Sequence, residues 1–310
     1  MSKVFVIDSE GIPLLPTHPA RSRKLLRTGK AKVKQVVPFT IQLNRKVENP
    51  VGSFEMGIDD GSKYVGIAVK NTKTNEIIFH AELNHRQDVS RLMEQRRNYR
   101  KSRRFRLRNR PPRFSNRIGF KIAPSIRQRK EAIVRVVKDF SKRLNIIKVI
   151  VEEVKFNHSK YRYGKFFSLT EIGKKYLKEQ IQQLGLVYET TFGYITKESR
   201  INLGLSKKHN HDACAIIGSN KIIGHEYSIK PRRTKVWENN PTKTCTEKNG
   251  FKHYDIIKAT HRTRGTVIGS IRSLKEKVIT LRTSFDNNFP VSYKKSKLLW
   301  RPNGLIYCRI

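Results

Sequence analysis

The segment FEMGIDDGSKYVGIAVKNTKTNEIIFHAEL, residues 54–83, decides the fold class. It contains three apolar runs rich in β-branched residues, and the turn-forming sequences GSK and NTKTN separate them. Short apolar runs joined by such turns are typical of antiparallel β-strands. We therefore expect a three-stranded meander, with Asp59 and Asp60 at the end of its first strand.

A second apolar strand further along the chain also ends in acids. The segment NIIKVIVEEVKFN, residues 145–157, has the pattern of a buried strand that ends near Glu152 and Glu153. An amphipathic helix is expected just before it, at residues 125–144, because its apolar residues recur with helical spacing. The strand at residues 145–157 is therefore expected to follow a helix and not to be part of the meander.

The segment HNHDACAI, residues 209–216, is expected to form a helix that follows another strand, LVYETTF. His209 and Asp212 are three residues apart, so they share one face of this helix. The full order is a strand-end Asp, a hairpin, a helix, a strand-end Glu and a helical Asp. An α/β fold of the RNase H type gathers its metal ligands in this way.

The chemistry that such acids support is metal-dependent phosphodiester cleavage. Two-metal cleavage needs about three or four carboxylates around ions ~3.5–4 Å apart, and the candidates are Asp59, Glu152 and Asp212. His209 would orient or deprotonate the nucleophile, or contact the scissile phosphate. Taken singly, a strand-end Asp before Gly-Ser is more often a turn former, and a helical His often makes only a structural hydrogen bond. The combination, in this order, carries the hypothesis.

The charge of the chain indicates a polyanionic partner. The 310 residues include 66 Lys plus Arg against 25 Asp plus Glu, a formal charge of +41. Nucleic acid is the partner that such a surplus favours. The apolar runs are too short for a transmembrane helix, and we see no secretory signal or membrane anchor. Three widely spaced cysteines argue against a disulfide scaffold or a zinc ribbon and fit a reducing cytoplasm.

The most basic part of the chain is RRNYRKSRRFRLRNRPPRFSNR, residues 96–117, with 11 Lys or Arg in 22 residues and no acid. A helix that is basic on every side cannot be covered by packing, so it is expected to lie between phosphates. A disordered basic tail is the alternative, and the internal position of the segment argues against it. The candidate nucleic-acid-binding residues here are Arg96, Arg97, Arg100, Lys101, Arg103, Arg104, Arg106, Arg108, Arg110, Arg113 and Arg117.

A shorter basic helix is expected at residues 20–29, closed by Gly29. Its candidates for contact with a nucleic-acid backbone are Arg21, Arg23, Lys24 and Arg27. A solvated helix face explains the same pattern equally well.

Several of these motifs together resemble one family. GIDDGSKYVGIAV, IVEEVKFN and HNHDACAI resemble the three RuvC motifs, residues 96–117 resemble the bridge helix of RNA-guided nucleases, and IPLLPTHPARSRKLLRTGKAKV resembles the PLMP domain. The set is similar to the transposon-encoded IscB and IsrB proteins. Only 57 positions separate Glu152 from His209 (209 − 152), which leaves no room for the HNH domain that IscB carries there. The resemblance is therefore to IsrB, and the H-N-H spelled by residues 209–211 is a coincidence.

The resemblance implies an RNase H-like (RuvC) α/β core split by an arginine-rich bridge helix. The implied domains are a PLMP-like domain at 1–50, RuvC part I at 51–92, the bridge helix at 93–118, RuvC parts II and III at 119–222, and a β-rich domain at 223–310 for guide-RNA and target-adjacent-motif interaction. By position in the family motifs, Asp59, Glu152 and Asp212 would hold two Mg²⁺ or Mn²⁺ ions, with His209 beside them. Asp60 stands where the family commonly has proline.

The implied activity is that of an omega-RNA-guided DNA endonuclease that nicks the non-target strand. Its partners would be one large structured guide RNA per protein and a double-stranded DNA target with an adjacent motif, in the cytoplasm of a prokaryote and at the nucleoid when on DNA. Two alternatives remain open: an RNA-independent RuvC-like nuclease of the junction-resolvase type, and a non-catalytic guide-RNA-binding protein.

Overall fold

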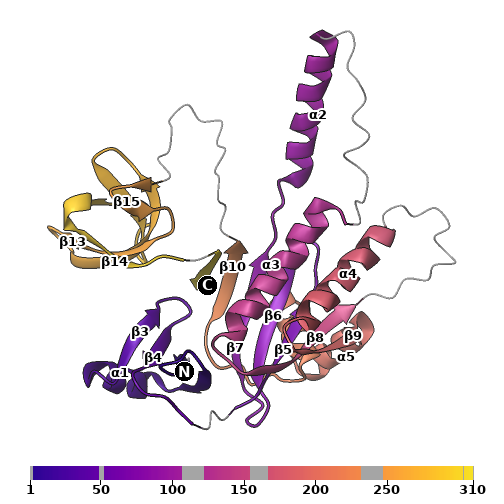
Figure 1. Ribbon diagram of the computed structural model, residues 1–310, viewed down its shortest axis with the longest axis horizontal. Coiled ribbons are helices and arrows are strands. Elements are labelled where there is room, and N and C mark those ends of the chain that lie inside the picture. Colours follow the sequence, from indigo (N-terminus) through magenta and orange to yellow (C-terminus); the bar gives the residue numbers. More distant parts are fainter. Residues whose placement is uncertain are drawn as a thin grey trace.

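A seven-stranded mixed sheet forms the centre of the molecule (Figure 1). The computed structural model describes residues 3–48, 52–106, 122–153, 167–231, 247–302 and 304–309. Across the sheet the strands follow the order β18 (Leu305–Arg309), β10 (Glu226–Pro231), β7 (Ile77–Asn84), β6 (Tyr64–Asn71), β5 (Phe54–Asp59), β8 (Ile146–Glu153) and β9 (Val187–Phe192).

The predicted meander is present as β5, β6 and β7, each antiparallel to the next. β8 pairs with β5 in parallel, and β9 pairs with β8 in parallel. An antiparallel meander extended on its first strand by two parallel strands fits an RNase H-like core, as the sequence predicts.

Helices cover both faces of this sheet. On one face lie α3 (Pro124–Ser141) and α4 (Phe167–Gln182), side by side in Figure 1. The apolar stripe of α3, which includes Ile133, Val137 and Phe140, is buried in the main hydrophobic core beneath them. On the other face, α6 (His209–Ile216) packs with Ala68, Ile77 and neighbouring apolar groups. α5 (Gly193–Asn202) follows β9 directly and contacts α6.

Residues 3–48 form a four-stranded sheet in the order β2 (Pro13–Thr17), β1 (Val4–Ile7), β4 (Thr40–Leu43) and β3 (Ala31–Gln35), with α1 (Pro19–Arg27) beside it. Sequence analysis predicts a short basic helix closed by Gly29, and α1 confirms it: Gly29 has φ +68°, the left-handed region in which glycine commonly follows a helix. This unit joins the main core through Phe5, whose ring lies edge-on 6.0 Å from that of Phe140.

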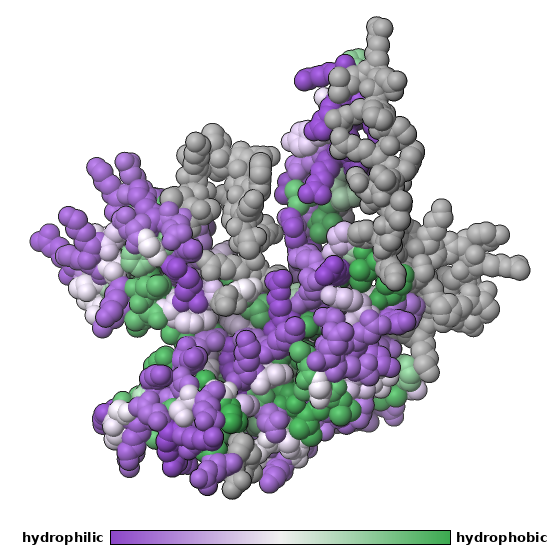
Figure 2. Space-filling model, viewed as in Figure 1, coloured by the Kyte–Doolittle hydropathy of each residue, from purple (hydrophilic) through white to green (hydrophobic). Residues whose placement is uncertain are grey.

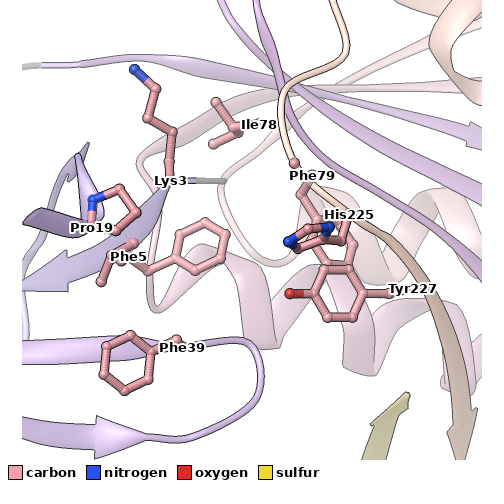
Figure 3. Close-up of a pocket in the computed structure, with 10 residues that line it drawn as sticks. Lys3, Phe5, Pro19, Phe39, Ile78, Phe79, His225 and Tyr227 are labelled. Carbon is pink, nitrogen blue, oxygen red and sulfur yellow. The ribbon is translucent and has the colours of Figure 1, made fainter. Parts of the chain in front are cut away.

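A cavity of about 220 Å³ lies between this N-terminal unit and the central sheet (Figure 3). Its lining is largely aromatic, with Phe5 and Phe39 from the N-terminal unit and Phe79 and Tyr227 from the sheet. Phe79 and Tyr227 stack at 5.1 Å between ring centroids. The interface between the N-terminal unit and the central sheet is therefore rich in aromatic side chains and includes a small cavity.

The C-terminal part divides differently from the predicted β-rich domain at 223–310. A separate five-stranded sheet runs β16 (Phe289–Ser292), β15 (Val278–Arg282), β14 (Gly265–Leu274), β13 (Ile256–His261) and β17 (Ser296–Trp300), and a short hairpin of β11 (Glu247–Lys248) and β12 (Phe251–Lys252) precedes it. β10 and β18, which lie inside the same range, belong to the central sheet. They do so because β18 buries Leu305 and Tyr307 in the main core.

The arginine-rich segment begins as α2 (Val89–Arg106), which follows β7 and extends away from the sheet (Figure 1). No residue of α2 is buried, and Figure 2 shows mostly hydrophilic side chains over it. Tyr99 and Phe105 are 66% and 93% exposed, so they pack on no neighbouring described element. None of the described helices is long and apolar enough to cross a membrane.

Candidate active site

The register of β5 and β8 brings the first two candidate acids together. In the parallel pair, Ile58 lies opposite Val151, so the next residues, Asp59 and Glu152, follow side by side. Successive strand residues point to opposite faces, and both acids therefore leave the sheet on the face opposite the buried Ile58 and Val151. The sequence predicts both as strand-end residues, and they are the last residue of β5 and the last but one of β8.

The helix α6 adds His209 and Asp212 above this edge of the sheet. His209 is the first residue of α6, and Asp212 lies in its first turn. The His209 Nδ1 atom lies 2.6 Å from the Asp59 Oδ2 atom. This contact joins residues 150 positions apart and brings the third predicted motif onto the first.

Two glycines of the sheet let α6 approach this closely. A Cβ on Gly66 would lie 1.7 Å from the His209 carbonyl oxygen, and a Cβ on Gly57 would lie 2.5 Å from the Ala213 carbonyl oxygen. Gly66 is the register partner of Asp59. The place of His209 over Asp59 therefore depends on a bare backbone at Gly66.

We expect Gly66→Ala to destabilise the fold by about 1–3 kcal/mol, as overpacking a rigid contact does, because the new methyl group meets helix backbone that must move as a unit. The measurement is the urea midpoint of the purified chain. Gly193→Ala is the matched control: its Cβ would lie 3.1 Å from Glu152 Oε1, the end of a flexible side chain. An unchanged midpoint in Gly66→Ala would contradict this account of how α6 is seated.

Burial and neighbouring acids both act on Asp59. Its side chain is 13% exposed, and burial raises its pKa from 3.8 to about 6. This value includes a lowering by the His209 hydrogen bond and a raising by the negative charges of Glu152 and Asp212. Glu152 and Asp212 are thus near enough for their charges to act on Asp59.

Sequence reasoning missed one charged member of the site, Arg200 on α5. Its Nε atom lies 2.7 Å from Asp212 Oδ1, and its side chain is 14% exposed. Burial raises the pKa of Asp212, and the Arg200 charge lowers it in part. Since Arg200 reaches Asp212 only through the fold of α5 beside α6, no local pattern signals its role.

The donor set at this edge suits a divalent cation in its chemistry. Carboxylate oxygens are the ligands that Mg²⁺ and Mn²⁺ prefer, and a cation would relieve the mutual repulsion of Asp59, Glu152 and Asp212. As the side chains stand, the described residues contain no group of three or more His, Cys, Asp or Glu arranged to hold a metal. Asp59 is directed to His209 and Asp212 to Arg200, so metal binding would exchange these partners for the ion.

The predicted nucleic-acid-binding residues lie on two exposed helices. On α1, Arg21, Arg23, Lys24 and Arg27 are exposed, whereas Ser22 is buried. On α2, the exposed basic residues are Arg96, Arg97, Arg100, Lys101, Arg103, Arg104 and Arg106. Within the described parts of the chain, no ion pair joins any of these side chains to an acid. Arg108, Arg110, Arg113 and Arg117 lie outside the described residues.

The structure is that of an α/β protein whose sheet order fits an RNase H-like core, with Asp59 and Glu152 near the ends of two neighbouring strands. The chain belongs to the RRXRR protein family, which matches residues 4–172. That range contains Asp59 and Glu152 and ends before His209 and Asp212. No curated protein has a sequence that matches this chain.

Among solved structures, Thermus thermophilus RuvC in complex with a Holliday junction substrate is 16% identical over 53% of this chain and 90% of that chain, with a TM-score of 0.32. A second Thermus thermophilus RuvC structure has the same identity and coverage and a TM-score of 0.31. A simian T-cell lymphotropic virus intasome in complex with the PP2A regulatory subunit B56 gamma is 7% identical over 84% of this chain and 85% of that chain, with a TM-score of 0.18. Likenesses this weak do not establish a shared function.

Proposed function

We propose that this protein is a metal-dependent DNA endonuclease of the RuvC type, guided by a bound RNA, that nicks the non-target strand of a double-stranded target. The observation that carries the proposal is the in-register pair Asp59 and Glu152 beneath α6, which adds His209 and Asp212. RRXRR membership supports it, since that family is associated with IscB- and IsrB-type proteins. A structured omega RNA is the expected guide.

The acidic and the basic residues of the site would have different roles. Asp59, Glu152 and Asp212 would hold two divalent ions, and such ions supply an activated water and a stabilised leaving oxygen. His209, freed from Asp59, would orient the attacking water or take its proton. Arg200 would be released from Asp212 toward the phosphate, where an arginine fork can bind two oxygens. One acidic centre of this kind would suit the cutting of one strand.

The basic helix α2 supports the guide-RNA part of the proposal. Its arginines are exposed on every side, and no described acid neutralises them. The arginines of such a helix repel one another unless opposite charges lie close by. Phosphates on several sides of the helix would neutralise that repulsion. Base pairing between the guide and the DNA would then supply sequence choice, with the protein gripping the backbone.

The test begins with the RNA that co-purifies with the full chain. The RNA is sequenced, and the complex is then incubated with a matched DNA duplex, with a randomised adjacent sequence, in Mg²⁺ or in EDTA. We expect a nick in the non-target strand that EDTA abolishes. Branched DNA cut equally well after RNase treatment would favour an RNA-independent nuclease of the same type. Tight RNA binding with no cut in any duplex would favour a non-catalytic RNA-binding protein.

A further inference from the structure

A second polar cluster lies behind the candidate active site, on the α3–α4 face of the same sheet edge. Because successive strand residues point to opposite faces, Asp60 and Glu153 leave the sheet on the side opposite Asp59 and Glu152. Asp60 confirms this direction by pairing with Lys130 of α3. Each candidate metal ligand on a strand thus has a neighbouring acid that is held on the far side.

Lys130 reaches Asp60 through a passage between two helices. The two side chains form an ion pair and are only 13% and 10% exposed. The stem of Lys130 passes Gly173 of α4, where an added Cβ would lie 3.4 Å from Lys130 Cε. The same Cβ would lie 2.7 Å from Ile126 Cγ2 of α3. The missing side chain at Gly173 therefore gives Lys130 its path and lets α3 and α4 pack closely.

Glu153 is held by a different element. The Tyr188 hydroxyl of β9 donates to Glu153 Oε1 at 2.9 Å. Burial, followed by the charge of Glu153, raises the pKa of Tyr188, so its hydroxyl keeps the proton that it donates. Glu153 is consequently fixed by a neutral donor, whereas Asp60 is fixed by a cation.

Another neighbour of this cluster, His85, does not compete with Lys130 for Asp60. It is 5% exposed, and burial lowers its pKa to about 4 despite the charge of Asp60. Arg129 and Lys130 lower this pKa further. Since His85 is neutral at physiological pH, Lys130 is the cation that the described structure pairs with Asp60.

We propose that Asp60 and Glu153 anchor the ends of β5 and β8, and that Lys130 is the positioning residue that sets the direction of Asp59 toward the metal site. The proposal rests on the proposed function and assigns a role to the acids that do not face the site. The link is the backbone: Asp59 and Asp60 are adjacent, and the Gly61 N–H donates to the Asp59 carbonyl at 3.0 Å. A held Asp60 side chain therefore fixes the peptide planes that orient the Asp59 carboxylate.

The experiment measures metal binding directly. Mn²⁺ is titrated into the full chain with its co-purified RNA, and free Mn²⁺ is followed by electron paramagnetic resonance. An Asp59→Asn sample carrying the same RNA provides the baseline for ions bound elsewhere. We expect Lys130→Met to weaken the Asp59-dependent Mn²⁺ affinity by about 10–100-fold, the usual cost of losing a residue that orients a metal ligand. Lys130→Arg, which keeps the charge, is expected to recover most of the affinity.

A double variant separates positioning from folding. Lys130→Met alone leaves Asp60 buried without a partner and lowers the melting temperature. In Asp60→Asn with Lys130→Met the buried charge is gone, so we expect the melting temperature to return while the Mn²⁺ affinity stays low. Wild-type affinity in either Met variant would overturn the positioning role and leave the proposed function standing. If the wild-type chain shows no Asp59-dependent Mn²⁺ binding, the proposed function fails, and the inference fails with it.

Discussion

In the Asp59→Asn variant we expect DNA cleavage to fall by at least ~10³-fold, equivalent to about 4 kcal/mol of lost transition-state stabilisation. The reason is that Asp59 is buried and the charges of Glu152 and Asp212 both act on it. An amide keeps the shape and can still bond to His209, but it brings no negative charge to a metal. Binding of the guide RNA is expected to be unchanged, because Asp59 lies on the sheet and the exposed basic residues lie on α1 and α2.

The same substitution is expected to stabilise the metal-free protein at neutral pH. Asp59 has a folded pKa of about 6 against an ordinary value of 3.8, so between these values the folded state holds the proton more tightly than the unfolded state. Stability therefore falls as pH rises from about 4 to about 6, and above pH 6 the full penalty remains, on the order of 3 kcal/mol. Asn carries no such penalty, and the gain should disappear near pH 4.

Mg²⁺ should reverse the order of stability of the wild-type chain and the Asp59→Asn variant. In the wild-type chain, bound ions offset the repulsion among the three acids, so the melting temperature at pH 7.5 should rise with Mg²⁺ concentration. The Asp59→Asn variant should respond far less, as measured by thermal unfolding with and without EDTA. Glu179→Gln, an exposed acid on α4, serves as the control for a lost charge away from the site. If the Asp59→Asn variant cuts DNA at the wild-type rate, Asp59 is not a metal ligand and the proposed chemistry is wrong.

The central elements of the site follow from local sequence patterns. The meander at 54–83, the strand that ends near Glu152 and the helix that begins at His209 were each predictable, because alternation and helical spacing record which face of an element is buried. Their order in the chain then indicated which ends would meet. The contact of His209 with Asp59 extends that prediction to a particular pair of atoms.

Local patterns fail where distant segments compete for a pairing partner. SKLLWRPNGLIYCRI, with Asn-Gly between two apolar runs, predicts a terminal hairpin. Instead β17 pairs with β13 and β18 pairs with β10 of the central sheet. The run VKQVVPFTIQLN likewise predicts one strand-like unit, yet a turn around Pro38 divides it into β3 and β4. Burial of Tyr307 in the main core outweighs a favourable turn, and no local pattern records that competition.

Neutralising three arginines of α2 is expected to have the second large effect, on RNA binding. In the triple variant Arg100→Gln, Arg103→Gln, Arg104→Gln, the affinity for the co-purifying RNA at 50 mM salt should fall by ~10³-fold, since charge-assisted contacts contribute about 1.5 kcal/mol or more each. Gln forms helices nearly as well as Arg, so α2 should persist. DNA cleavage should fall in parallel with RNA occupancy and recover at saturating RNA.

The salt dependence identifies these contacts as phosphate contacts. Each lost contact to a single strand lowers the slope of log affinity against log salt by ~0.7, so three lost contacts lower it by ~2. The ratio of wild-type to variant affinity should then shrink about 15-fold between 50 and 200 mM salt. Arg→Lys at the same three positions keeps the charge, so the slope should stay at the wild-type value while the affinity falls less. An unchanged slope in the Gln variant would mean that α2 does not lie along phosphates, since no acid within the described residues forms an ion pair with these three arginines.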